Sequence, residues 1–131
     1  MKRILVVDDE VDTLNLLKMM LELIGYTAIT TPDPEYALTL AETEKPDCVL
    51  LDIMMPRLDG FTVCKMLRLH PATRNLPIVF VSAYQASNLE ARRIEAGADL
   101  LVPKPASMDA LIRTIDRAIA IRKQAQAAQS G

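Results

Sequence analysis

Five polar side chains of the sequence belong to types that together can carry out phosphoryl-group chemistry. Asp8 and Asp9 are adjacent acids, Asp52 is a third acid, and Ser82 and Lys104 add a hydroxyl and an ammonium group. Carboxylates can bind a cation or act as nucleophiles, and hydroxyl and ammonium groups can stabilise the negative charge that develops during group transfer. These residues lie at or just after short apolar runs, so they can act together only if the fold brings the ends of those runs to one place.

Three acids at one place would repel one another, so a cation is expected among them. Two unit charges about 5 Å apart at an effective dielectric constant near 20 repel by roughly 3 kcal/mol. Oxygen ligands favour a hard ion, and a site that leaves room for water and phosphate oxygens is typical of Mg²⁺. With Mg²⁺ and Lys104 nearby, Asp52 could accept a phosphoryl group, because a loose transition state needs mainly positioning and charge stabilisation.

The apolar pattern predicts five strands that alternate with helices. Short apolar runs cover residues 4–7, 26–30, 48–51, 78–81 and 100–102, and longer segments of helical spacing lie between them. This alternation is typical of an α/β fold with a parallel sheet covered by helices on both faces. Ligands of such sheets bind outside the carboxyl ends of the strands, which is where the five polar residues lie.

Helix boundaries are indicated by caps and turn residues. Asp33-Pro34 has the pattern of an N-cap followed by proline in the first helical turn, and Asp59-Gly60 predicts a tight turn into the third helix. Ser87 to Glu90 has the spacing of a capping box, which predicts the start of the fourth helix. Gly25 and Gly97 lie where left-handed C-terminal caps are expected. One helix is therefore expected after each strand.

Four motifs of the sequence resemble the receiver domain of two-component response regulators. They are Val7-Asp8-Asp9, residues 50–60 with the sequence LLDIMMPRLDG, Val81-Ser82-Ala83 and Lys104-Pro105. The resemblance covers residues 2 to about 123, so we expect a receiver domain at 1–123 and a polar tail or the start of a linker at 124–131. It implies a (βα)5 flavodoxin-like fold, with five parallel strands in the order 2-1-3-4-5 between five helices.

The resemblance also implies a metal site and a phosphorylated residue. Asp52 matches the aspartate that a histidine kinase phosphorylates, and Asp8 and Asp9 match the acidic pair that binds Mg²⁺. Asp52 and the backbone carbonyl of Met54 complete the implied protein ligands. Taken alone, Asp8 and Asp9 could simply cap the helix that follows. Their coincidence with Asp52 and Lys104 favours the metal site.

Two further positions match residues that act on the phosphoryl group, and one position departs from the pattern. Lys104 matches the lysine that contacts the phosphoryl group, with a cis bond to Pro105, and Ser82 matches the hydroxyl residue that turns toward it. Receivers usually have an aromatic residue three positions before that lysine, and Leu101 stands there instead. Tyr84, beside the implied pocket mouth, is a candidate gate.

The resemblance implies a signalling role rather than an enzymatic one. The expected partners are a sensor histidine kinase or phosphotransfer protein and a downstream effector domain or protein, and a homodimer is also considered. Phosphorylation would change the surface formed by the fourth strand, the fourth helix, the fifth strand and the fifth helix. The only chemistry expected is the chain's own phosphorylation and dephosphorylation.

Two other functions remain open at this stage. One is a receiver-like interaction module that acts without phosphorylation. The other is a Mg²⁺-dependent hydrolase with an aspartyl-phosphate intermediate, which would normally have a second acid where Met54 stands.

The composition argues against two kinds of partner, nucleic acid and membrane, and bears on the location of the protein. The 15 Lys and Arg residues against 17 Asp and Glu residues leave a net charge of −2, which argues against direct nucleic-acid binding. No apolar stretch is long enough to span a membrane. With two cysteines, Cys48 and Cys64, expected to be unpaired, a cytoplasmic location is predicted.

Overall fold

Strands and helices alternate along the whole chain in the computed structural model, which describes residues 2–130. The strands are β1 (Arg3–Val7), β2 (Thr27–Thr31), β3 (Cys48–Leu51), β4 (Ile78–Ser82) and β5 (Leu100–Pro103). The helices are α1 (Val11–Ile24), α2 (Pro34–Glu44), α3 (Gly60–Leu69), α4 (Leu89–Ala96) and α5 (Met108–Ser130). Each predicted strand and helix is present.

The strands form a single parallel sheet in the order β2-β1-β3-β4-β5. This order confirms the predicted (βα)5 flavodoxin-like fold. In the central strands the apolar runs are buried completely, because neighbouring residues face opposite sides of a sheet and both sides are covered. The crossover order places β1 beside β3, so the carboxyl ends of these two strands are neighbours.

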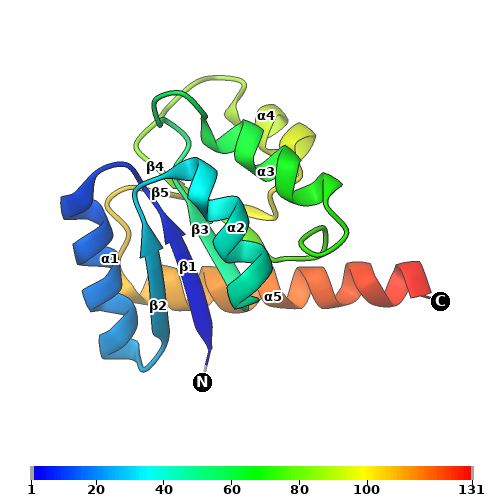
Figure 1. The fold of residues 1–131 in the computed structure, drawn as a ribbon, viewed down its shortest axis with the longest axis horizontal. Helices are drawn as coiled ribbons and strands as arrows, with labels where there is room; N and C mark the ends of the chain where they lie inside the picture. The colour runs from blue at the N-terminus through cyan, green and yellow to red at the C-terminus, as the bar shows by residue number, and fades with distance from the viewer. Residues whose placement is uncertain (1, 131) are drawn as a thin grey trace.

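The helices cover the sheet in two layers, as Figure 1 shows. Helices α1 and α5 lie on one face, where their apolar residues pack against Val6 and Leu50. Helices α2, α3 and α4 lie on the other face, where they pack against Val7, Leu51 and Phe80. The alternation of Val6 with Val7 and of Leu50 with Leu51 therefore supplies both halves of the core.

Three of the predicted helix caps form as expected. The Asp33 side chain accepts a hydrogen bond from the Glu35 backbone N–H at 2.9 Å, with Pro34 in the first turn of α2. Gly25 and Gly97 end α1 and α4 with φ angles of 105° and 93°, a left-handed conformation that glycine adopts at little cost.

Two other capping predictions are wrong. Helix α4 begins after Asn88, which makes no side-chain capping bond, and Glu90 binds Arg93 with both carboxylate oxygens instead of closing a capping box. Asp9 does not cap α1, whose N-cap residue is Glu10 and has no side-chain capping bond. At α4 the bidentate ion pair with Arg93 is a stronger partner for the Glu90 carboxylate than the helix end offers.

Helix α5 continues through the residues expected to form a polar tail. It is helical as far as Ser130, and in Figure 1 its last turns extend past the sheet toward the C-terminus. Residue 131 lies outside the described residues. The domain boundary at residue 123 therefore stays a prediction. Among residues 2–130, no helix combines the length and apolar character needed to cross a bilayer.

A buried carboxylate ties three helices together at the amino-terminal edge of the sheet. The side chain of Asp99 is 1% exposed and accepts hydrogen bonds from Arg122 Nε at 2.7 Å, Arg68 Nη2 at 3.1 Å and the Ile78 backbone N–H at 2.9 Å. Arg93 donates to the Asp99 carbonyl at 2.9 Å. Helices α3, α4 and α5 are thus joined at one residue before β5.

We predict that Arg68→Ala lowers the free energy of unfolding by about 3 kcal/mol, because it removes one of the two cations that bind the buried Asp99 carboxylate and the hydrogen bonds that Arg68 donates to the Gly97 and Leu76 carbonyls. Lys65→Ala is the matched control on the same helix, since it removes an exposed ion pair with Glu95. The control should cost less than about 1 kcal/mol. Denaturant unfolding of the three proteins measures both values, and an equal cost for the two variants would contradict the role assigned to Asp99.

Candidate functional site

Strand pairing brings the three predicted acids together. Val7 of β1 pairs with Leu51 of β3, and the Asp52 backbone N–H donates to the Val7 carbonyl at 2.9 Å. The residues that follow these strands, Asp8 and Asp52, are therefore neighbours, and both are buried. Together with Asp9 they offer carboxylate oxygens that lie within 4.8 Å of one another.

Lys104 enters this cluster from the loop after β5. Its Nζ donates to Asp8 Oδ2 at 2.6 Å and lies 3.5 Å from Asp52 Oδ1. The Lys104 backbone N–H donates to the Ser82 carbonyl at 3.1 Å, and its peptide bond to Pro105 is cis, as the resemblance implies. One ammonium group thus contacts acids from two different strand ends.

Burial and the neighbouring charges shift the pKa values of Asp52 and Lys104. Burial, followed by the charge of Asp8, raises the pKa of Asp52 from 3.8 to about 6, although Lys104 acts in the opposite direction. Burial lowers the pKa of Lys104, but the hydrogen bond to Asp8 and the charge of Asp52 outweigh it, so that this pKa is raised overall. Lys104 therefore stays charged and offsets only part of the repulsion.

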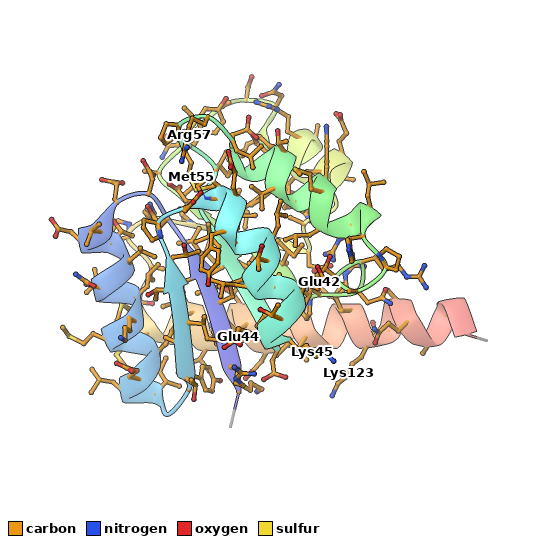
Figure 2. The ribbon with its side chains drawn as sticks, in the orientation of Figure 1. Glu42, Glu44, Lys45, Met55, Arg57 and Lys123 are labelled. Carbon is orange, nitrogen blue, oxygen red and sulfur yellow. The ribbon has the colours of Figure 1, made fainter. Side chains whose placement is uncertain are left out.

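Ser82 and Met54 lie at the same edge of the sheet. Ser82 ends β4, is buried, and accepts a hydrogen bond through its Oγ from the Tyr84 backbone N–H at 3.0 Å. Met54 lies in the loop between β3 and α3, and its side chain is exposed. The neighbouring loop residues Met55 and Arg57 appear at this end of the molecule in Figure 2, with Glu44 and Lys45 at the opposite end of α2.

The donor atoms suit Mg²⁺. All three acids offer oxygen ligands, two of them are buried, and a single ammonium group, that of Lys104, contacts these two buried carboxylates. A hard divalent cation with an incomplete protein shell is the type of ion that such a set binds. The thioether of Met54 is a soft ligand, so only its backbone carbonyl is a plausible donor to this ion.

Two residues of the site were missed by the sequence reasoning. Glu10 Oε1 lies 3.9 Å from Lys104 Nζ, which makes Glu10 an outer member of the charge cluster. Gly60 was expected only in a turn, yet its backbone N–H donates to the Ile53 carbonyl at 2.8 Å. A Cβ atom on Gly60 would collide with the Asp52 carbonyl oxygen and lie 2.8 Å from the Ile53 Cα. The absence of a side chain at Gly60 therefore lets α3 pack directly against the backbone of Asp52.

The sequence matches known proteins over most of its length. Residues 4–116 match the family described as response regulator receiver domain. The chain is 46% identical over 106 residues to the alkaline phosphatase synthesis transcriptional regulatory protein PhoP of Bacillus subtilis, covering 81% of this chain and 43% of that protein. It is 41% identical over 103 residues to the response regulator PleD of Caulobacter vibrioides, covering 79% of this chain and 23% of that one.

Solved structures agree with this match. The chemotaxis protein CheY4 of Vibrio cholerae superposes with a TM-score of 0.84 at 25% identity, over 90% of this chain and 98% of that one. The receiver domain of the sensor histidine kinase PA1611 of Pseudomonas aeruginosa has a TM-score of 0.83 at 27% identity, over 91% and 98% of the two chains. That structure was solved with a magnesium ion coordinated in its active-site cleft.

We predict that Mg²⁺ raises the melting temperature of the wild type, because a ligand that binds only the folded state stabilises it by mass action. Without divalent cations, and above pH 6, Asp52→Asn should melt about 3 °C or more above the wild type, because it removes a buried charge whose raised pKa disfavours the ionised form. Differential scanning calorimetry with Mg²⁺ or a chelator tests both effects. A wild type that does not respond to Mg²⁺ would exclude the metal site.

We further predict that Gly60→Ala reduces the Mg²⁺-dependent rise in melting temperature, because the added Cβ displaces the backbone of Asp52. Gly25→Ala is the control, since its Cβ would meet nothing within 4 Å but its φ of 105° disfavours alanine. The control should lose stability, by about 1–2 kcal/mol, and keep the full response to Mg²⁺. The same thermal measurement compares the two variants, and a full response in Gly60→Ala would refute the packing argument.

Proposed function

The chain belongs to the family of response regulator receiver domains, and we propose that it accepts a phosphoryl group from a histidine kinase on Asp52. One observation supports this choice of residue above the others. Asp52 is buried beside the acidic pair with the Lys104 ammonium 3.5 Å from its Oδ1, whereas both carboxylate oxygens of Asp8 already accept hydrogen bonds, from the Glu10 backbone N–H and from Lys104. Those are the surroundings that a carboxylate needs to act as a phosphoryl acceptor.

The ligands of the proposed Mg²⁺ are Asp8, Asp9, Asp52 and the backbone carbonyl of Met54. When bound, the ion supplies positive charge to the phosphoryl oxygens and to the acids that hold it. Asp8 has a second role, because its Oδ1 accepts the Glu10 backbone N–H at 2.9 Å while its Oδ2 accepts the Lys104 ammonium. These two bonds fix the orientation of the Asp8 carboxylate.

In the proposed transfer, a carboxylate oxygen of Asp52 forms a bond to phosphorus while the bond from phosphorus to the donor breaks. The donor's leaving atom takes the electron pair of that bond. Lys104 stabilises the negative charge on the phosphoryl oxygens, and the Ser82 hydroxyl turns from the Tyr84 N–H to donate a hydrogen bond to one of them. The added charge thereby favours one of two arrangements of the loop after β4.

The proposed partners follow from this chemistry. A sensor histidine kinase or a phosphotransfer protein supplies the phosphoryl group, and an effector domain or protein reads the surface formed by β4, α4, β5 and α5. A homodimer is a further proposal. The chain spans less than half the length of PhoP and PleD, 43% and 23% respectively. An effector on the same polypeptide is therefore compatible with the comparisons.

The remaining features of the proposal are a receiver domain at 1–123 and a linker that starts within the last turns of α5. The activity consists of the chain's own phosphorylation and dephosphorylation, without turnover of another substrate. Cys48 and Cys64 are both buried and free of disulfides, which is compatible with a reducing cytoplasm. The net charge of −2 supports a role without direct nucleic-acid contact.

The test is the intact mass of the protein after incubation with acetyl phosphate. We expect one added phosphoryl group on the wild type with Mg²⁺, and none with a chelator or on Asp52→Asn. Lys104→Met should react at least about tenfold more slowly, because it removes the ammonium that stabilises the transferring group. Circular dichroism of each variant controls for folding.

Two results would contradict the proposal. Phosphate added to Asp52→Asn at the wild-type level would place the acceptor elsewhere. No addition to folded, Mg²⁺-bound wild type would favour the interaction module that acts without phosphorylation.

A further inference from the structure

The Ser82 hydroxyl makes a hydrogen bond to the backbone of the loop that follows β4. Ser82 Oγ accepts the Tyr84 backbone N–H at 3.0 Å. Because the Ser82 Oγ accepts this hydrogen bond, any rotation of the Ser82 side chain toward Asp52 breaks the bond and leaves the Tyr84 N–H without its acceptor. The position of Tyr84 is therefore coupled to the rotamer of Ser82.

The Tyr84 ring belongs to an aromatic group on the α2–α4 face of the sheet. Its centroid lies 6.5 Å from that of Phe61 with an angle of 78° between the rings, and Phe61 lies 5.3 Å from Phe80 at 83°. Phe61 and Phe80 are buried and Tyr84 is half-buried. Both contacts have the edge-to-face geometry that aromatic pairs favour. Phe61 thus connects the loop after β4 to the first turn of α3.

The same Phe61 ring contacts α4 through a cation. The guanidinium carbon of Arg92 lies 4.0 Å from the ring centroid, well within the range of a cation–π interaction. Arg92 is in the middle of α4 and half-buried. A second contact between the two helices, Lys65 Nζ with Glu95 Oε1 at 3.2 Å, is exposed and does not involve the ring. Phe61 therefore joins Tyr84 to α4.

The fifth strand has no aromatic ring at the position facing this group. Leu101 pairs with Phe80 in the sheet and packs, half-buried, against the same core. A leucine there can fill space but cannot stack on an aromatic edge or attract a cation. The aromatic contacts near Ser82 are made instead by Tyr84 and Phe61.

We propose that Tyr84, Phe61 and Arg92 form an aromatic bridge that transmits the state of Ser82 to α4. This inference rests on the proposed function and assigns positioning roles to three residues of the signalling path. In the resting state the Ser82–Tyr84 bond holds the ring of Tyr84 against Phe61, and Phe61 holds Arg92. When the Ser82 hydroxyl turns to the phosphoryl group, Tyr84 is released, its contact with Phe61 changes, and α4 loses part of its attachment to α3.

The bridge also has a short connection to the phosphorylation site. Phe61 directly follows Gly60, whose backbone packs against Asp52. The residue whose ring contacts α4 therefore directly follows the residue that packs against the backbone of Asp52. Movements of Asp52 and of Ser82 would both reach Arg92 through Phe61.

The test is the response of the backbone amides to beryllofluoride, a phosphoryl mimic, with Mg²⁺, in ¹⁵N-labelled protein by NMR. In the wild type we expect shift changes at Asp52, Ser82 and Tyr84 and along α4. In Arg92→Gln the changes near Asp52 and Ser82 should persist, while those of α4 fall by about half or more. Tyr84→Ala should have the same effect, and Tyr84→Phe, which keeps the ring, should restore the α4 response.

Lys65→Gln is the matched control, because it removes a cationic contact between α3 and α4 that does not involve Phe61. It should leave the α4 response unchanged. The double variant Tyr84→Ala with Arg92→Gln should reduce the response no further than either single change, since both break the same bridge. Phosphorylation by acetyl phosphate should continue in Arg92→Gln and in Lys65→Gln.

Two outcomes would overturn the inference in distinguishable ways. If wild-type α4 responds and Arg92→Gln responds equally, the bridge is excluded while the phosphoryl acceptor stands. If the wild type shows no change at Asp52 and Ser82, the proposed function fails and the bridge fails with it.

Discussion

The pairing of β1 with β3 holds two buried carboxylates, Asp8 and Asp52, beside a third acid, with one ammonium group between them. The repulsion within this cluster is the constraint on which the site depends. Burial and the charge of Asp8 together raise the pKa of Asp52, the hydrogen bond to Asp8 and the charge of Asp52 raise the pKa of Lys104, and the repulsion among the acids favours binding of a divalent cation. A carboxylate in this position can accept a phosphoryl group because the charges needed to stabilise the transfer surround it before the donor arrives.

The rest of the fold holds the three acids in place despite their repulsion. Parallel strands buried on both faces fix the positions of the acids, and Asp99 ties α3, α4 and α5 together at the opposite edge of the sheet. One edge is therefore held by a buried carboxylate with two guanidinium partners, while the other carries three acids with one ammonium group, that of Lys104, among them. Between them, α4 is attached to α3 through the Phe61 ring and an exposed ion pair. These two contacts are additional to the buried network, which also holds α4 through Arg93, and the contact with the Phe61 ring is the one that the proposed bridge would loosen.

Much of the fold and of the site could be predicted from the sequence because apolar runs and strand-end residues are local patterns. The five strands, the glycine caps at Gly25 and Gly97 and the meeting of Asp8 with Asp52 follow from such patterns. Contacts between distant residues could not be predicted. Glu90 makes an ion pair with Arg93 instead of a capping box. The need for glycine at position 60 arises because α3 packs against the backbone of Asp52, a contact that the sequence pattern does not reveal. The placement of Arg92 over Phe61 joins residues on different helices and has no sequence signature.

The central claim is that Asp52, rather than another acid of the cluster, carries the phosphoryl group. Borohydride reduction tests it most directly, because it converts an aspartyl phosphate to homoserine and marks the position permanently for peptide mass spectrometry. After incubation with acetyl phosphate and Mg²⁺, we predict homoserine at position 52, with Asp8 and Asp9 unchanged. Homoserine at Asp8 or Asp9 would contradict the assignment, and so would phosphate incorporated into the protein without homoserine at position 52.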